Sequence, residues 1–245
     1  MQPTTTRSIK EAIKIDFFII KLKWFIFFIY LVYIRVYLEK TIVFDWNGQM
    51  KSKDWLNRHK RDTYVKKAKK QGYLSRAAYK LLEIENKFHF ITNSKKILEL
   101  GAAPGGWSQV ALELNPKIEI TAIDILDLKI NHPQINFYKD DFLNFNYNEK
   151  KNYYDLILSD IAPNTTGHQS TDHLRIATML FDIIDLLDKV LVTNGSFITK
   201  IWKGSEEKQI INKLKKKFKL VSYFKPNSSR KDSAEIFIVA RNFNN

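Results

Sequence analysis

A lysine stands in an apolar stretch near the end of the chain. In GSFITKIWKG, residues 195–204, Lys200 interrupts a strand-like run that begins at Phe197. Such a lysine either faces solvent on an edge strand or is a buried charge with a chemical task. A lysine with its ordinary pKa of about 10.4 is protonated at neutral pH. It can accept a proton from a substrate when desolvation or a neighbouring cation lowers that pKa, so Lys200 is a candidate general base.

A glycine-rich turn follows the first apolar run of the central region. In ELGAAPGGW, residues 99–107, the glycines have the spacing G-x-x-x-G-G and Pro104 precedes the last two. Glycines between a strand and a helix let the backbone approach a ligand, and the helix N-terminus offers free N–H groups. The spacing differs from the G-x-G-x-x-G of dinucleotide sites, which argues against a dehydrogenase.

Acidic residues follow the next three apolar runs. Asp124 lies 23 residues after Gly101, Asp140 and Asp141 end the next run, and Asp160 ends the one after. Any one of them alone could cap a loop. Together with the glycine turn they favour an adenosyl ligand, because open α/β sheets bind ligands at the carboxyl ends of their strands and an acid there suits ribose hydroxyls.

Alternating elements must position these residues. Apolar runs predict seven strands, and amphipathic patterns predict four helices between or before them. The strands are expected at 95–101, 119–125, 135–141, 154–160, 195–201, 219–225 and 235–241, and the helices at 75–88, 105–115, 173–192 and 205–217. The alternation predicts an α/β fold with a mostly parallel sheet and helices on both faces. The last two strands lack an intervening helix and should form an antiparallel hairpin at one edge. Ser75 is expected to cap the helix at 75–88.

Composition favours a polyanionic partner. The 245 residues carry a formal net charge of +14 and contain no cysteine, which excludes disulfides, thiolate metal sites and cysteine nucleophiles. Residues 51–70 hold nine Lys or Arg against two Asp, with Trp55, His59 and Tyr64 interleaved. This mixture suits RNA, whose bases stack on aromatic rings while its phosphates pair with cations. A solvated tail is the alternative reading of such a charge run.

The N-terminal 49 residues differ from the rest. Residues 13–38 are rich in Phe, Ile and Tyr, but the longest uninterrupted apolar run, Trp24 to Ile34, has eleven residues. A membrane-spanning helix needs about twenty. The segment is therefore a peripheral membrane helix, a helix that packs elsewhere, or upstream sequence translated from a start codon set too early. We expect Met50 to be the physiological start, because the character of the sequence changes there.

Five motifs, in this order, resemble the FtsJ/RrmJ family of S-adenosylmethionine-dependent RNA 2′-O-methyltransferases. They are YLSRAAYKLLEI, LELGAAPGGWSQ, LSDIAPNTTGH, ITKIWKG and SSRKDSAEIFIVA. The resemblance covers about residues 50–242 and excludes 1–49. It implies a Rossmann-like methyltransferase fold and three regions: an apolar extension (1–49), a basic RNA-binding segment (50–72) and a methyltransferase domain (73–245).

The resemblance also implies site residues. The family's Lys-Asp-Lys-Glu tetrad falls on four positions, which we call the tetrad: Lys80, Asp160, Lys200 and Glu235. Cofactor contacts fall on Gly105, Trp107, Asp124, Asp141 and Asp160, with Asp140 as an alternative to its neighbour. Where the family usually has Asp-Met-Ala-Pro, this chain has Asp-Ile-Ala-Pro. No metal is implied.

The tetrad suits methyl transfer to a ribose hydroxyl, a weak acid that must lose its proton as it attacks. We expect Lys200 to accept the proton while Lys80 and Glu235 position it and the hydroxyl. Asp160 and Glu235 would orient the two ammonium groups and limit the cost of burying them. Outside the tetrad, Lys203, Arg230 and Lys231 are expected to contact RNA phosphates.

The implied function is methylation of a uridine 2′-hydroxyl in 23S rRNA, free or within the large ribosomal subunit. The enzyme is expected to be cytoplasmic and monomeric and to use S-adenosyl-L-methionine. Methylation of tRNA or of an mRNA cap is an alternative, as is an inactive RNA-binding factor for ribosome assembly. A membrane-attached protein is suggested by residues 13–38 alone. Taken singly, Lys80 resembles an ordinary surface lysine and Glu235 a strand-end charge, so the order of the motifs carries the assignment.

Overall fold

The computed structural model describes residues 60–162, 168–230 and 233–244. Several sequence expectations lie outside the described residues. These are the extension 1–49 with its apolar part and the start at Met50, residues 51–59 of the basic segment, and Lys231. Within the described ranges, no helix is long and apolar enough to cross a membrane.

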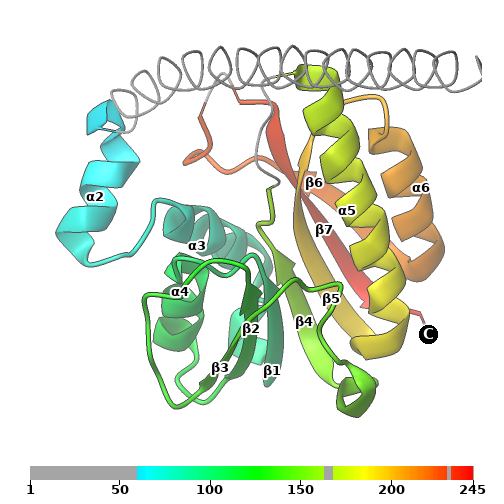
Figure 1. The fold of residues 1–245 in the computed structure, drawn as a ribbon, viewed down its shortest axis with the longest axis horizontal. Helices are drawn as coiled ribbons and strands as arrows, with labels where there is room; N and C mark the ends of the chain where they lie inside the picture. The colour runs from blue at the N-terminus through cyan, green and yellow to red at the C-terminus, as the bar shows by residue number, and fades with distance from the viewer. Residues whose placement is uncertain (1–59, 163–167, 231–232, 245) are drawn as a thin grey trace, which may run out of the picture. The chain divides into compact units, whose positions relative to one another are not determined.

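A seven-stranded sheet forms the centre of the structure, with the order β3-β2-β1-β4-β5-β7-β6 (Figure 1). The strands are β1 (Lys96–Leu100), β2 (Glu119–Asp124), β3 (Ile135–Lys139), β4 (Tyr154–Ser159), β5 (Leu191–Trp202), β6 (Phe218–Phe224) and β7 (Glu235–Phe243). The first five run parallel, and β7 pairs antiparallel with both β5 and β6. The predicted α/β fold, with an antiparallel hairpin at one edge, is therefore confirmed.

Helices cover both faces of this sheet. They are α2 (Thr63–Gln71), α3 (Ala77–Phe88), α4 (Gly106–Leu114), α5 (Gln169–Val190) and α6 (Glu207–Lys217), with short 3₁₀ turns η1 (Ile91–Asn93) and η2 (Asn148–Lys150). Buried residues of α3 and α4 form one apolar cluster with Ile97 of β1, and those of α5 and α6 form another with Leu98. Successive strand residues point to opposite faces, so the continuous apolar runs in the sequence supply both clusters.

The boundary between α5 and β5 differs from the sequence prediction. The helix expected at 173–192 runs from Gln169 to Val190, and the strand begins at once with Leu191. Leu191 pairs with Tyr154 of β4, after which the register shifts so that Ser196 pairs with Leu156. The strand that carries Lys200 is therefore irregular between Leu191 and Ser196, and helical periodicity alone could not show that Leu191 is drawn into the sheet.

Ser75 does not cap α3, contrary to the prediction. The helix begins at Ala77, and Arg76 occupies the N-cap position without a side-chain capping bond. The Ser75 hydroxyl is instead buried without a hydrogen-bond partner in the described structure. It lies against Gly106, where an added Cβ would come within 2.3 Å of the Ser75 Oγ. The serine thus faces the glycine turn rather than its own helix.

The second half of the basic segment folds as α2, a helix that the charge pattern of the sequence did not predict. Asp62 caps it, accepting hydrogen bonds from the backbone N–H groups of Tyr64 and Val65 at 3.0 and 3.4 Å. The helix ends at Gly72, whose φ of 82° lies in the left-handed region that glycine adopts freely. Four lysines are exposed or partly exposed along it: Lys66, Lys67, Lys69 and Lys70.

Candidate active site

Lys200 is buried beside the end of β4. Its side chain donates to Asp160 twice, to Oδ1 and to the backbone oxygen, each at 2.7 Å. The register of the parallel pair β4–β5 aligns Ser159 with Thr199, so the next residue of each strand meets its neighbour at the same sheet edge. Lys200 is 7% exposed. It is therefore a buried charge with a fixed partner, and the edge-strand interpretation is excluded.

Lys80 and Glu235 form the second ion pair of the site. The Lys80 Nζ lies 2.7 Å from Glu235 Oε2, with the lysine on α3 and the glutamate at the start of β7. Glu235 pairs across the sheet with Trp202, two residues beyond Lys200. The antiparallel insertion of β7 beside β5 therefore brings this carboxylate to the edge where β5 ends.

Electrostatics link the two pairs. Burial by itself raises the pKa of Asp160, but the positive charges of Lys200 and Lys80, with the hydrogen bond from Lys200, outweigh it and hold that pKa below its ordinary value. Lys80 thus acts on Asp160 although its own hydrogen bond goes to Glu235. The four tetrad residues predicted from the motifs are brought together in one site.

The loop before β7 holds Glu235 in place, a contribution that the sequence did not predict. Ser229 donates to Glu235 Oε1 at 2.8 Å. On α3, Glu83 accepts from the backbone N–H groups of Asn227 and of Ser228. Arg76 donates to the Ser228 carbonyl oxygen and also pairs with Asp62. The only sequence signal was the position of Ser229 in the quoted SSRKDSAEIF motif.

The residues that were predicted to contact RNA phosphates differ in their surroundings. Arg230 directs its Nε to Asp62 at 3.2 Å, so part of this side chain is held by a carboxylate. Lys203 follows β5 and is exposed. Lys231 lies outside the described residues.

The glycine turn joins β1 to α4 as expected. Gly105 has a φ of 112°, and an added Cβ would approach Ile130 to 2.7 Å and Leu74 to 3.2 Å. Only glycine suits that conformation and space. Backbone N–H groups in the first turn of α4 have no acceptor within the helix, and the orphaned Ser75 hydroxyl lies beside them. This arrangement fits the carboxylate of an amino-acid ligand.

Trp107 anchors α4 from within the core. The residue is 3% exposed, its Nε1 donates to the Ala77 carbonyl oxygen at 2.8 Å, and its ring packs near that of Phe237 with centroids 5.9 Å apart. A cofactor contact at this position would therefore use the backbone N–H rather than the indole.

The acids after β2 and β3 are oriented by backbone bonds. Asp124 accepts from Ala103 N and Leu126 N, each at 2.8 Å, so it ties the glycine turn to the end of β2. Asp141 accepts from Leu143 N at 3.0 Å and is partly buried, whereas Asp140 is exposed. Carboxylate oxygens have several acceptor sites each, so these bonds leave capacity for ligand hydroxyl and amino groups.

Glu99 is a buried acidic residue near the glycine turn for which the sequence predicted no role. It lies in β1 next to the glycine turn, is 2% exposed, and accepts a hydrogen bond from Ser108 Oγ at 2.5 Å. Burial raises its pKa to about 8, and the nearby Asp160 and Asp124 add to the shift. The glutamate is therefore largely protonated at neutral pH. A single acid within the otherwise apolar run of β1 was the available signal.

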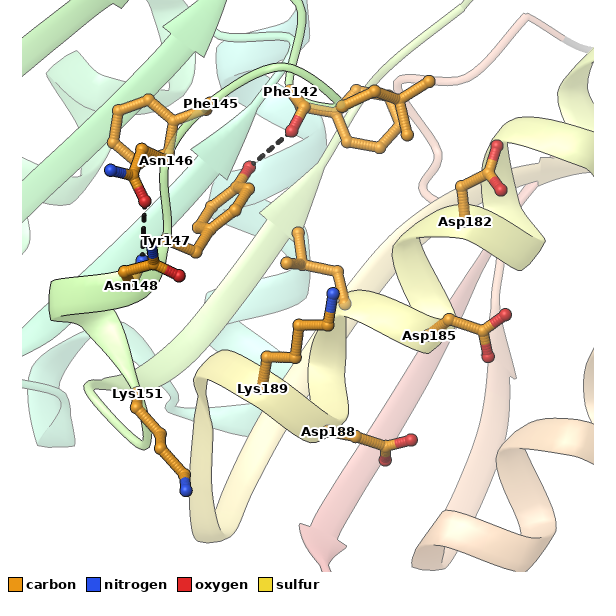
Figure 2. Close-up of a pocket in the computed structure, with 12 residues that line it drawn as sticks. Phe142, Phe145, Asn146, Tyr147, Asn148, Lys151, Asp182, Asp185, Asp188 and Lys189 are labelled. Carbon is orange, nitrogen blue, oxygen red and sulfur yellow. Dashed lines mark hydrogen bonds between the residues drawn. The ribbon is translucent and has the colours of Figure 1, made fainter.

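A separate hollow of about 530 Å³ lies between the β3–β4 connection and α5 (Figure 2). Tyr147 crosses it and donates to the Phe142 carbonyl oxygen at 3.0 Å. None of the predicted site residues lines it. Within the described residues, no group of three His, Asp or Glu side chains could hold a metal ion.

Known proteins are similar to this chain in sequence and in fold. Residues 73–243 match the profile of the FtsJ-like methyltransferase family. Proteins named ribosomal RNA large subunit methyltransferase E are 43% identical over 201 residues in Rickettsia bellii and 42% identical over 202 residues in Rickettsia felis. Each alignment covers 78% of this chain and 88% of the relative.

A solved structure shows the same architecture. The crystal structure of a protein described as a ribosomal RNA methyltransferase from Plasmodium falciparum superposes with a TM-score of 0.61 at 32% identity, covering 70% of this chain and 98% of that one. The matched family profile spans the sheet, the glycine turn and all four tetrad residues. The chain therefore belongs to the FtsJ-like methyltransferase family.

Proposed function

We propose that this protein transfers the methyl group of S-adenosylmethionine to the 2′-hydroxyl of a uridine in 23S rRNA. The observation that carries the proposal is the pairing of Lys200 with Asp160, in a site that Lys80 and Glu235 complete. The names of the Rickettsia relatives support large-subunit rRNA as the substrate. The resemblance supports uridine, a single-chain enzyme and a cytoplasmic location.

The residues at the carboxyl edge of the sheet fit the cofactor. The turn at Gly105 and the first turn of α4 would receive the methionine carboxylate, with the unpartnered Ser75 hydroxyl beside them. Asp124 would accept the ribose hydroxyls and Asp141 would lie at the adenine. When bound, S-adenosylmethionine supplies an electrophilic methyl group on a sulfonium.

The geometry at Lys200 suits a proton acceptor. The charged form of Lys200 that pairs with Asp160 has no lone pair, so it must first release a proton before it can accept one. The neutral amine that results has two N–H bonds and one lone pair. The two bonds from Lys200 to Asp160 employ both N–H groups, each at 2.7 Å. The lone pair is then directed away from Asp160 and is available to the substrate hydroxyl. The proton of the substrate hydroxyl would pass to Lys200 as its oxygen attacks, and S-adenosylmethionine, when bound, would supply the methyl group and keep the electron pair of the broken S–C bond.

The other members of the site hold this arrangement. Asp160 stays ionised because its pKa is lowered by the two lysines, so it fixes Lys200 and the hydroxyl can approach from one direction. Glu235 holds Lys80, whose charge faces the same region. Holding the hydroxyl and the methyl group together supplies a large part of the rate in two-substrate transfers.

Ribose-methylation mapping tests the proposal. Total RNA is compared between cells with the gene, cells without it, and deleted cells complemented with the wild type or with Lys200→Ala. We expect one 23S uridine to lose its 2′-O-methyl group on deletion and to regain it only with the wild type. A map without any gene-dependent rRNA position would refute the substrate, and full restoration by Lys200→Ala would refute the role of the lysine.

A further inference from the structure

A hollow of about 560 Å³ lies between α2 and α3, apart from the tetrad, and we call it the α2–α3 hollow. Its lining includes three tyrosines and three polar side chains: Tyr64, Tyr73, Tyr79, Lys67, Gln71 and Asn86. The volume falls within the range of roughly 300–1,000 Å³ that is usual for small-molecule sites. The mixture of aromatic, basic and amide groups is that of sites for nucleobases.

The three tyrosines form an aromatic cluster in which one ring is buried and two are accessible. Tyr79 is 6% exposed, and its ring centroid lies 5.4 Å from that of Tyr64 and 5.6 Å from that of Tyr73. Tyr64 and Tyr73 are partly exposed. A planar ligand could therefore stack on either of these two rings without displacing the buried one.

Polar groups surround the rings. The Lys67 Nζ lies 4.7 Å from the centroid of the Tyr79 ring. Gln71 accepts the hydrogen bond of the Tyr79 hydroxyl with its Oε1, which leaves its NH₂ group as a donor. Asn86 adds an exposed amide from α3. These groups can hydrogen-bond to the edge of a base, while Lys67 and the other lysines of α2 neutralise the adjoining phosphates.

The hollow and the tetrad lie on neighbouring faces of one helix. Tyr79, at the floor of the hollow, immediately precedes Lys80. Glu83 lines the hollow and also holds the loop that carries Ser229. Arg76, which binds the same loop, lies over the Tyr64 ring at 5.8 Å from its centroid. An RNA strand with one ribose at Lys200 would therefore pass the hollow within a short distance.

We propose that the α2–α3 hollow binds a nucleobase of the RNA substrate, stacked on Tyr64 and near the nucleotide that is methylated. The proposal rests on the proposed function for the identity of the substrate as RNA. It gives the general RNA-binding role predicted for the basic segment a defined subsite for one base.

Binding of RNA with and without bases tests the subsite. The full chain is titrated into a fluorescent single-stranded RNA oligonucleotide and into an abasic oligonucleotide with the same backbone. Wild type should prefer the base-containing RNA. Tyr64→Leu should reduce that preference by roughly 5- to 50-fold, because stacking on one aromatic ring is lost. Tyr64→Phe should keep the preference, since it keeps the ring.

A second variant blocks the hollow without removing a tyrosine. Asn86→Trp places an additional ring at its mouth and should also reduce the preference for base-containing RNA. Matched controls are Tyr138→Leu, an exposed tyrosine on β3, and Asn148→Trp, beside the hollow of Figure 2. Both should behave as wild type.

The outcomes separate this inference from the proposed function. Reduced preference in both Tyr64→Leu and Asn86→Trp supports the subsite. If either variant prefers base-containing over abasic RNA as strongly as wild type does, the proposal is overturned. The tyrosines are then a structural cluster that joins α2 to α3. Binding requires no methyl transfer, so failure to methylate rRNA with an intact base preference would refute the proposed function alone.

Discussion

Lys80 and Glu235 are separated by 155 residues and are joined by an ion pair of 2.7 Å. The other oxygen of Glu235 accepts from Ser229 at 2.8 Å, so both oxygens of the carboxylate are used. Lys80 also contributes to the lowered pKa of Asp160. Ser229 thus holds Glu235, Glu235 holds Lys80, and the charge of Lys80 lowers the pKa of Asp160. The loop before β7 is therefore linked to the carboxylate that binds Lys200.

Ser229→Ala should weaken catalysis without weakening binding. A hydrogen bond to a charged group contributes about 1.5–3 kcal/mol. Loss of part of that energy from the orientation of Glu235 should lower kcat roughly 3- to 30-fold. Steady-state methylation assays should show KM for RNA and for cofactor near their wild-type values.

Ser205→Ala is the matched control for this change. Ser205 also donates to a glutamate, Glu206 at 2.6 Å, but that pair is exposed and the bond reaches no tetrad residue. It should retain wild-type kcat. Equal kcat for wild type and Ser229→Ala would show that Glu235 needs no second partner.

Lys200→Arg should keep a positive charge beside Asp160 but abolish proton transfer. A guanidinium does not lose its proton in proteins, so it cannot accept one from the hydroxyl. The rate of a single turnover should fall by roughly 10²- to 10⁴-fold, the usual contribution of general-base catalysis. Cofactor affinity, measured by calorimetry, should change little.

Lys213→Arg is the matched control for Lys200→Arg. Lys213 pairs with Asp185 on the opposite face of the sheet, and its replacement should leave the single-turnover rate unchanged. Substantial activity in Lys200→Arg would assign Lys200 to charge placement rather than to proton transfer.

Gly106→Ala should destabilise the protein through one contact, and Ser75→Ala should relieve it. A Cβ on Gly106 would lie 2.3 Å from Ser75 Oγ, but its distance to the Ser75 Cβ is an ordinary 3.4 Å. Gly106 starts α4, where alanine is otherwise favourable. Gly106→Ala alone should therefore lower the free energy of unfolding by about 1–3 kcal/mol.

The double variant Gly106→Ala/Ser75→Ala should recover most of this loss, as measured by urea denaturation. Its cofactor affinity should remain below that of wild type, because the Ser75 hydroxyl beside the turn is gone. Additive destabilisation in the double variant would show that the two side chains do not meet.

The fold and the tetrad were accessible from the sequence for different reasons. Strand and helix order followed from apolar periodicity, and β7 could be placed in an edge hairpin because no helix precedes it. The tetrad residues were found through five motifs in fixed order. Periodicity could not show that α5 ends at Val190, because Leu191 is recruited by pairing with Tyr154 across the sheet.

The partners within the site required tertiary structure. Which lysine pairs with which acid depends on the side-by-side placement of β4 with β5 and on the approach of α3 to β7. Ser75 illustrates the same limit, since a serine before an amphipathic run is a good capping candidate until packing against Gly106 is known. Glu99 was missed because a single acid in an apolar run gives no indication of its protonation state.

Glu99→Gln should make the protein's stability less dependent on pH. Burial raises the pKa of Glu99 from 4.5 to about 8, so the folded state retains a proton that the unfolded state releases. The stabilisation is fully present below the unfolded pKa and is lost as pH rises toward the folded pKa. Between about pH 5 and pH 8, the free energy of unfolding of wild type should therefore fall relative to that of Glu99→Gln.

Urea denaturation across this pH range measures the difference. Glutamine resembles the protonated acid in shape and has no proton to lose, so the gap between the variants should open in favour of Glu99→Gln as pH increases. Glu149→Gln, an exposed glutamate in η2, should follow the wild-type curve. Parallel curves for wild type and Glu99→Gln would mean that Glu99 is ionised in the fold, and the bond from Ser108 would then be a bond to a carboxylate rather than to a carboxylic acid.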